Sequence, residues 1–173
     1  MILKELTTLD STDVYEMLQR IGPAENEFHN DVNGMTFEEY KQWLKKQHSW
    51  SMGDELPAGY VKQWTYWLYE DEVPIGYGKL RERATEESKE FGGNIGFAID
   101  PLYRRKGYGN VFFRLLLDKA KTLGIKEVFS TVEKFNYASK TIHENCGGCL
   151  IKEDEIRWYF IFYLGKLPSE CQQ

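Results

Sequence analysis

The stretch 104–110 combines three basic side chains with two glycines, directly ahead of a predicted helix. Gly107 and Gly109 carry no Cβ, so an anion can approach the backbone closely at both positions. The first turn of a helix also presents unpaired N–H groups and the positive end of the helix dipole. We predict a pyrophosphate-binding turn, with a merely solvated basic loop as the alternative. The residues concerned are Arg104, Arg105, Lys106, Gly107, Tyr108, Gly109 and Asn110.

Two common phosphate-binding motifs do not fit this stretch. A P-loop needs Gly-x-x-x-x-Gly-Lys-Ser/Thr, and the chain contains no such run. A dinucleotide fingerprint needs a third glycine where Phe112 stands. The pattern Arg104-x-x-Gly107-x-Gly109 instead resembles the Arg/Gln-x-x-Gly-x-Gly/Ala signature of the GNAT family of N-acetyltransferases. This resemblance implies acetyl-CoA (coenzyme A) as co-substrate, with no metal.

A second motif strengthens the resemblance. Val132-x-x-x-Asn136-x-Ala138-Ser139, followed by a Gly-Gly pair, is similar to the strand-to-helix segment of the same family. The resemblance implies that Asn136 and Ser139 lie against the pantetheine arm of the cofactor. The alternative for Asn136 is a helix N-cap, which its position favours, and both roles can hold together.

The resemblance also assigns a role to the strand that precedes the basic turn. In the family this strand parts from the next parallel strand, and the pantetheine arm lies in the wedge between them. The positions carried over are Phe97, Ala98 and Ile99, acting through backbone groups. Pro101 supports this physically, because it has no N–H and ends the ladder. The alternative is that all three are core residues.

The implied reaction is direct acetyl transfer to an amine, which must lose a proton before it attacks. Many family members place a tyrosine seven residues after the asparagine, as the acid for the departing thiolate; here that residue is His143. A histidine can protonate a thiolate near neutral pH, but this one also fits a surface helix position. Tyr159 and Tyr108 are alternative acids.

Glu133, near the end of a predicted strand, is the first candidate for the general base. Other acidic or basic side chains lie in a polar segment, 25–34, that helps to shape the acceptor pocket in the family. They are Glu25, Glu27, His29 and Asp31. An aromatic strand could contribute to an apolar acceptor site, although alternation makes half of its side chains core. Its residues are Trp64, Tyr66, Trp67 and Tyr69.

The elements that position these residues follow from capping and periodicity. Thr36 and Glu39 form a capping box that opens a helix bearing Tyr40, Trp43 and Leu44 on one face. Apolar spacing predicts a central helix bearing Phe112, Leu116, Ala120 and Leu123, ended by Gly124. Further helices are predicted from Asp10 or Ser11 to Ile21 and from Asn136 to Asn145. Strands are predicted at 2–6, 61–69, 73–83, 93–100, 127–132, 149–152 and 156–164, with connections at 25–34, 51–59 and 85–90 and a loose tail at 166–173.

This order predicts an α/β fold with a mixed, mostly antiparallel central sheet of about seven strands. A strand–helix–strand crossover supplies a central parallel pair, and helices cover both faces. No linker or repeat interrupts the chain, so residues 1–173 are expected to form one N-acetyltransferase domain. The order agrees with the GNAT family over almost the whole chain.

Composition limits the partners. Hydrophobic residues make up 42% and charged residues 28% of the 173 residues, which is typical of a globular domain. The formal net charge of −5 argues against general nucleic-acid binding and is compatible with a cationic substrate. No apolar run approaches the roughly 18 residues of a membrane span. The N-terminus becomes polar too early for a signal peptide, so a cytoplasmic protein without membrane contact is expected.

Three cysteines give no disulfide framework. Cys146 and Cys149 form a Cys-x-x-Cys, but the pair follows a predicted helix, whereas a redox motif needs its first cysteine at a helix N-terminus. A zinc site needs more ligands than this pair supplies. We predict a reduced pair around a glycine helix stop.

The acceptor stays open between a small-molecule amine, a peptide N-terminus and a lysine side chain. A non-catalytic acyl-CoA-binding module is the alternative to an enzyme. The protein is expected to be a monomer or a homodimer, with the aromatic strand 158–163 as a candidate interface.

Overall fold

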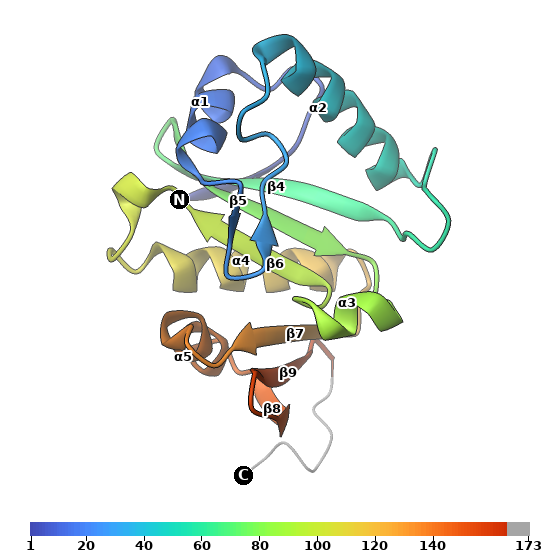
Figure 1. The fold of residues 1–173 in the computed structure, drawn as a ribbon, viewed down its shortest axis with the longest axis vertical. Coiled ribbons are helices and arrows are strands. Elements are labelled where there is room, and N and C mark those ends of the chain that lie inside the picture. Colours follow the sequence, from blue (N-terminus) through green and yellow to red (C-terminus); the bar gives the residue numbers. More distant parts are fainter. Residues whose placement is uncertain (166–173) are drawn as a thin grey trace.

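The computed structural model describes residues 1–165 (Figure 1), so the predicted loose tail lies outside the described residues. The elements are β1 (Ile2–Glu5), α1 (Thr12–Arg20), β2 (Ala24–Glu25), β3 (Phe28–His29), α2 (Phe37–Met52), β4 (Gln63–Glu70), β5 (Val73–Arg81), α3 (Glu86–Glu90), β6 (Ile95–Ile99), the 3₁₀ turn η1 (Pro101–Tyr103), α4 (Tyr108–Thr122), β7 (Glu127–Glu133), α5 (Tyr137–Asn145), β8 (Cys149–Glu153) and β9 (Arg157–Tyr163). Within residues 1–165, none of the helices has the length and apolar character that crossing a membrane requires.

Two larger sheets meet along β6 and β7. Their strand orders are β1-β4-β5-β6 and β7-β9-β8, and every pairing within them is antiparallel. β6 and β7 point in the same direction (Figure 1) and touch where the Asn94 N–H donates to the Phe129 carbonyl oxygen over 2.9 Å. The predicted mixed α/β fold is therefore confirmed, with β6 and β7 as the parallel neighbours at its centre.

Helices cover both faces, as predicted (Figure 1). α1 and α2 pack on one face, around the buried side chains of Met17, Leu44 and Trp67. α4 packs on the other face, where Phe112 and Leu116 enter the larger core. The wedge between β6 and β7 is therefore held by a core on each side.

β5 divides its side chains between these two layers. Gly76 and Gly78 face α4, because a Cβ on them would lie 2.9 Å and 2.8 Å from the Phe112 ring. Tyr77 belongs to the opposite cluster, under α1 and α2. Strand alternation places Lys79 on the same side as Tyr77.

Capping groups fix the helix ends. Thr36 accepts from the Glu39 N–H over 3.3 Å while its own N–H donates to the Glu39 carboxylate over 2.7 Å, which confirms the capping box of α2. α4 begins after Gly107 and is followed by Gly124, both with positive φ. The helix behind the basic turn thus starts and stops where the sequence predicts.

Two segments differ from the prediction. The expected loop 25–34 contains the small hairpin β2–β3, whose turn residues Asn26 and Glu27 have φ of 49° and 64°. A two-residue turn with two positive φ values usually carries glycine at its second position. Here that position is Glu27, so no local sequence signal indicated the turn. The expected connection 85–90 contains α3, capped by the Thr85 hydroxyl, which accepts from the Ser88 N–H over 3.1 Å.

Candidate functional site

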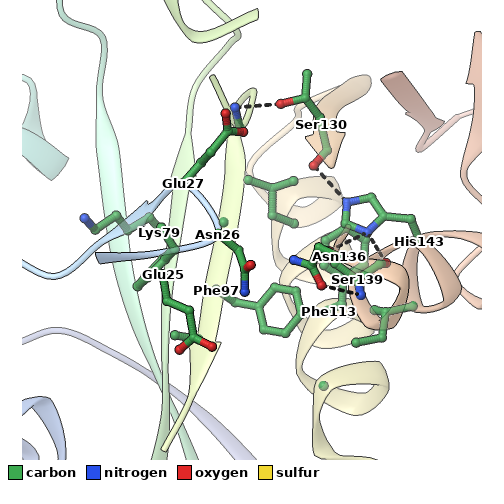
Figure 2. A pocket seen from close by; sticks show the side chains of 18 of the residues that line it. Glu25, Asn26, Glu27, Lys79, Phe97, Phe113, Ser130, Asn136, Ser139 and His143 are labelled. Atoms are coloured by element: carbon green, nitrogen blue, oxygen red, sulfur yellow. Dashed lines mark hydrogen bonds between the residues drawn. The ribbon is translucent and has the colours of Figure 1, made fainter. Parts of the chain in front are cut away.

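A cavity of about 1000 Å³ lies where the two sheets part. β6 and the start of α4 line one side of it, β7 and α5 line the opposite side, and the β2–β3 hairpin borders it as well (Figure 2). The cavity also reaches β5 beneath the hairpin. It includes every residue predicted to bind the cofactor except Lys106, namely Phe97, Ala98, Ile99, Arg104, Arg105, Gly107, Tyr108, Gly109, Asn110, Asn136 and Ser139.

The two glycines of the basic turn serve different purposes. Gly107 caps α4 with a φ of 82°, and a Cβ placed on it would meet no atom within 4 Å. A Cβ on Gly109 would lie 2.8 Å from Cδ1 of Ile142, so this glycine lets α5 approach α4. The open space at Gly107 fits a phosphate group, because a side chain there would fill the position that an anion needs.

The three basic side chains of the turn also have different surroundings. Arg104 donates to both carboxylate oxygens of Glu25, over 3.0 Å and 2.6 Å, and its Nε donates to the Ile99 carbonyl over 3.0 Å. Arg105 is exposed, lines the cavity and forms no ion pair within residues 1–165. Lys106 lies off the cavity, its Nζ 5.1 Å from the centre of the Tyr103 ring. Arg105 is therefore the cation that this turn offers to a ligand.

The outer edge of β6 faces the wedge. The Asp100 N–H donates to the Ile75 carbonyl on β5 over 2.9 Å. This bond shows which residues of β6 direct their backbone groups toward β5. Because the hydrogen-bonding direction alternates, the backbone groups of Ala98 point toward β5, whereas the N–H groups of Phe97 and Ile99 point away from it. Ala98 lines the cavity, but only its two neighbours direct backbone donors into the wedge.

Asn136 lies at the start of α5, as predicted. Its Oδ1 accepts from the Ser139 N–H over 3.1 Å, which makes it the N-cap of the helix. In Figure 2 the amide oxygen points to Ser139 and the amide nitrogen points to the other side, toward Phe97. The capping role thus leaves an amide donor for a ligand.

His143 is buried, with 3% of its surface exposed, so its interpretation as a surface helix residue is wrong. Its Nδ1 lies 2.8 Å from the Ser139 carbonyl oxygen, which can only accept, so Nδ1 carries the proton. Its Nε2 then accepts from the Ser130 hydroxyl, also over 2.8 Å (Figure 2). Burial lowers the pKa of His143 to about 4, against the opposing effect of the Ser139 carbonyl. The imidazole is therefore neutral near pH 7.

The two alternative acids are hydrogen-bonded to carboxylates outside the wedge. Tyr108 lines the cavity, but its hydroxyl donates to Glu70 at the end of β4. The Tyr159 hydroxyl donates to Asp154 over 2.7 Å, and this residue does not line the cavity. Neither phenol directs its proton toward the wedge.

Glu133 ends β7 but does not line the cavity. Burial raises the pKa of its carboxyl, the charge of Glu27 raises it further, and Arg157 opposes both. A raised pKa makes the carboxylate a stronger base, but Glu133 is not among the residues that line the cavity.

Ion pairs tie the β2–β3 hairpin to both sides of the cavity. Glu25 binds Arg104 of the basic turn, and Glu27 accepts from Arg157 of β9 over 3.0 Å. These glutamates and His29 line the cavity, whereas the exposed Asp31 does not. The expected loop is therefore a hairpin that ion pairs hold against both sides of the cavity.

Alternation predicted that half of the aromatic side chains on β4 are core and that the others could line an acceptor site. All four instead pack into the two cores, and none lines the cavity: Trp64, Tyr66, Trp67 and Tyr69. The cavity instead contains Lys79, Arg81 and Ser130, which sequence reasoning missed. Lys79 and Arg81 alternate within an otherwise apolar strand, and this pattern could have indicated that both charges face a cavity. Ser130 gave no such signal.

Cys146 caps the C-terminus of α5, the end opposite to that of a redox motif, as predicted. Burial raises the pKa of its thiol. Within the described part of the chain, no three His, Cys, Asp or Glu side chains converge as metal ligands would.

Residues 1–148 match the model of a protein family described as "Acetyltransferase (GNAT) domain". A search of curated proteins found no match.

Solved structures share the fold at low sequence identity. The Campylobacter jejuni N-acetyltransferase PseH in complex with acetyl coenzyme A has a TM-score of 0.62 and 17% identity, with 94% of this chain and 97% of that chain covered. The ribosomal-protein-S5-alanine acetyltransferase from Vibrio fischeri has a TM-score of 0.66 and 15% identity, covering 93% and 91%. A chimera of spermidine N-acetyltransferase SpeG from Vibrio cholerae has a TM-score of 0.65 and 14% identity, covering 100% of both chains.

Proposed function

Because this chain belongs to the GNAT family of acetyltransferases, we propose that it transfers the acetyl group of acetyl-CoA to the primary amine of a small molecule. The observation that carries the proposal is the wedge between β6 and β7, which ends at the open N-terminus of α4. Acetyl-CoA supplies the thioester when bound. The N–H groups of Phe97 and Ile99 and the amide of Asn136 would hold its pantetheine arm, and Gly107 with Arg105 would hold its pyrophosphate.

The Phe97 N–H is also the donor best placed to stabilise negative charge on the thioester oxygen. It belongs to a strand that is hydrogen-bonded to β5 on its other edge, so it is fixed before the reaction begins. A preorganised donor of this kind stabilises developing charge without reorganisation. The backbone of β6 would therefore both bind and activate the thioester.

Ser130 and neutral His143 would transfer the proton that moves from the acceptor nitrogen to the sulfur of CoA. The Ser130 hydroxyl is directed at the lone pair of Nε2, and both residues line the cavity. Through this hydroxyl the imidazole can accept a proton from the attacking nitrogen and return it to the departing thiolate. His143 thus acts as a base before it acts as the acid for the thiolate, and its lowered pKa favours the second transfer.

Glu133 stays the candidate for the earlier step, the removal of a proton from the ammonium form of the acceptor. Since it lies off the cavity, water would carry the proton to it. Its raised pKa suits this role.

Cofactor binding is tested by thermal unfolding with acetyl-CoA. At a concentration of about 100 Kd the ligand adds about 2.7 kcal/mol by mass action. For a chain of this size we expect the melting temperature to rise by about 5–10 °C. An unchanged melting temperature at saturating acetyl-CoA would overturn the proposal.

Catalysis is tested by release of the CoA thiol over a panel of small amines, lysine-containing peptides and peptides with free N-termini. Turnover of small amines supports the proposal. Preferred turnover of peptides would move the acceptor class to proteins. Tight binding of acetyl-CoA without turnover of any acceptor would indicate an acyl-CoA-binding module.

A further inference from the structure

One buried and one half-buried cation lie at the end of the cavity beneath the β2–β3 hairpin. Lys79 on β5 is 9% exposed, and its Nζ donates to the His29 carbonyl oxygen over 2.6 Å. Arg81, two residues further along the same strand face, donates from Nη1 to the Gly93 carbonyl oxygen over 3.0 Å. Figure 2 shows the Lys79 ammonium on the opposite side of the hairpin side chains from His143.

Neither cation has a carboxylate partner within residues 1–165. The other buried or half-buried arginines of the cavity region do: Arg104 pairs with Glu25, and Arg157 pairs with Glu27. These pairs also neutralise the two hairpin carboxylates that face the cavity. The remaining carboxylate of the lining, Glu87, is exposed and belongs to α3. The uncompensated charge at this end of the cavity is therefore positive.

Burial of these two groups is unfavourable in the absence of an anion. Desolvation lowers the pKa of Lys79 to about 8, although the charge of Asp31 opposes the change, and desolvation also lowers the pKa of Arg81. Charges removed from water are normally paired with an opposite charge. This corner of the fold therefore has unused capacity to bind an anion.

We propose that Lys79 and Arg81 bind an anionic group, a carboxylate or a phosphate, carried by the acetyl acceptor. The acceptor then combines a primary amine, placed at the wedge, with an anion some distance from it. A guanidinium fork matches both oxyanions, and the ammonium adds a point charge. This inference rests on the proposed function and names the class of its acceptor. It excludes polyamines, whose cationic ends this corner would repel.

The first experiment compares acceptors that differ only in charge. The pairs are 4-aminobutyrate with its amide, and 3-aminopropyl phosphate with 3-aminopropanol; spermidine is the polycation. We expect kcat/KM for the anionic members to exceed that of their neutral partners by about 10- to 100-fold, the effect of one or two charge-assisted hydrogen bonds. The two pairs also show whether carboxylate or phosphate is preferred.

The second experiment uses Lys79→Met and Arg81→Lys. Lys79→Met should raise KM for the preferred anionic acceptor about tenfold or more, with little change in kcat and none for the neutral analogue. Arg81→Lys retains the charge without the fork and should have a smaller effect. Arg83→Met removes an exposed cation just beyond β5, off the cavity, and is the matched control.

The outcomes separate this inference from the proposed function. Turnover with no preference for anions, or equal KM values in wild type and Lys79→Met, would overturn the inference and leave the acetyltransferase proposal intact. If acetyl-CoA binds but nothing turns over, thermal shifts of the CoA-saturated protein with succinate and with inorganic phosphate, against chloride, decide the inference. A shift that Lys79→Met abolishes supports it, and equal shifts in both proteins contradict it.

Discussion

At the scale of single residues, His143 is the most informative position. Its ring lies 4.5 Å from the ring of Phe113 and is enclosed by the α4 side of the core, yet both of its nitrogens are hydrogen-bonded. A buried neutral imidazole resists protonation, because the charged form loses its hydration. This burial links the proton chemistry of the site to the acid stability of the fold.

We expect wild type to lose stability through His143 as the pH falls. The pKa of His143 is about 4 in the folded state and 6.5 in its ordinary range, so the unfolded chain binds the proton first. The contribution is complete above about pH 6.5, is lost as the pH falls toward 4, and is on the order of 3 kcal/mol. Urea unfolding at pH 7, 6 and 5 should show a shallower pH dependence in His143→Gln.

His48→Gln is the control for this series, because His48 is exposed on α2. Its pH dependence should match that of wild type. Parallel curves for His143→Gln and wild type would contradict the buried neutral imidazole.

The sequence predicted that position 143 belongs to the site, but not its environment. Lys140 and Glu144 on the same helix are polar, so the local pattern indicated a surface position. The burial comes from Phe113 and Phe162, which belong to other elements and reach the ring only after the sheets assemble. Ser130 was missed for the same reason, since nothing adjacent in sequence marks a serine as the partner of a distant histidine.

At the scale of elements, two glycines with similar positive φ flank α4, one before the start of the helix and one after its end. Gly107 and Gly124 have φ of 82° and 79°, and a Cβ on either would meet no atom within 4 Å. Gly107→Ala and Gly124→Ala should each lower stability by about 1–2 kcal/mol, the strain of a left-handed alanine. Only Gly107 lines the cavity, so only its variant should weaken acetyl-CoA binding, by about tenfold.

Calorimetric titration of both variants with acetyl-CoA measures this difference. Equal affinities in the two variants would remove the phosphate-binding role from the helix N-terminus. The two variants should still have equal free energies of unfolding, because the loss of stability depends on backbone conformation alone.

Elements with strong local signals were predicted well, and weak ones were not. The capping box at Thr36 and the glycine after Leu123 fixed two helices to within a residue or two. The hairpin β2–β3 was not predicted, because its strands are two residues long and its glutamates are paired with Arg104 and Arg157. Such partners come from segments far away in the sequence, which no local pattern reveals.

At the scale of the whole molecule, the two sheets are joined at the root of the wedge. Asn94 accepts from the Phe129 N–H through Oδ1 over 2.6 Å, and Gly93 lies directly against the same part of β7. The sequence predicted that β6 and β7 are parallel neighbours, but not where they part. At that point the backbone and side chain of Asn94 both bond to Phe129, contacts that no local sequence pattern reveals.

We expect Gly93→Ala to disrupt this junction. A Cβ there would lie 2.0 Å from the Phe129 carbonyl oxygen, with a φ of 76° adding strain. Its neighbour Gly92 has a φ of 80° and open space, so Gly92→Ala should cost about 1–2 kcal/mol. Urea unfolding should show Gly93→Ala less stable than Gly92→Ala by a further ~2 kcal/mol or more.

Acetyl-CoA affinity should fall more in Gly93→Ala than in Gly92→Ala, because only a Cβ on Gly93 would collide with β7 at the point where the wedge opens. Equal unfolding energies for the two variants would mean that the sheets can separate here without cost.

The alternation of β5 has a consequence for protein engineering. Gly76 and Gly78 are closed to variation by Phe112 and Leu116, whereas Lys79 points into the other layer. A library that randomises Lys79 and Arg81 would therefore alter the end of the cavity that we propose for the acceptor, while the face against α4 keeps its packing. New acceptor specificities could then be selected through one strand without changes to the proposed acetyl-CoA site.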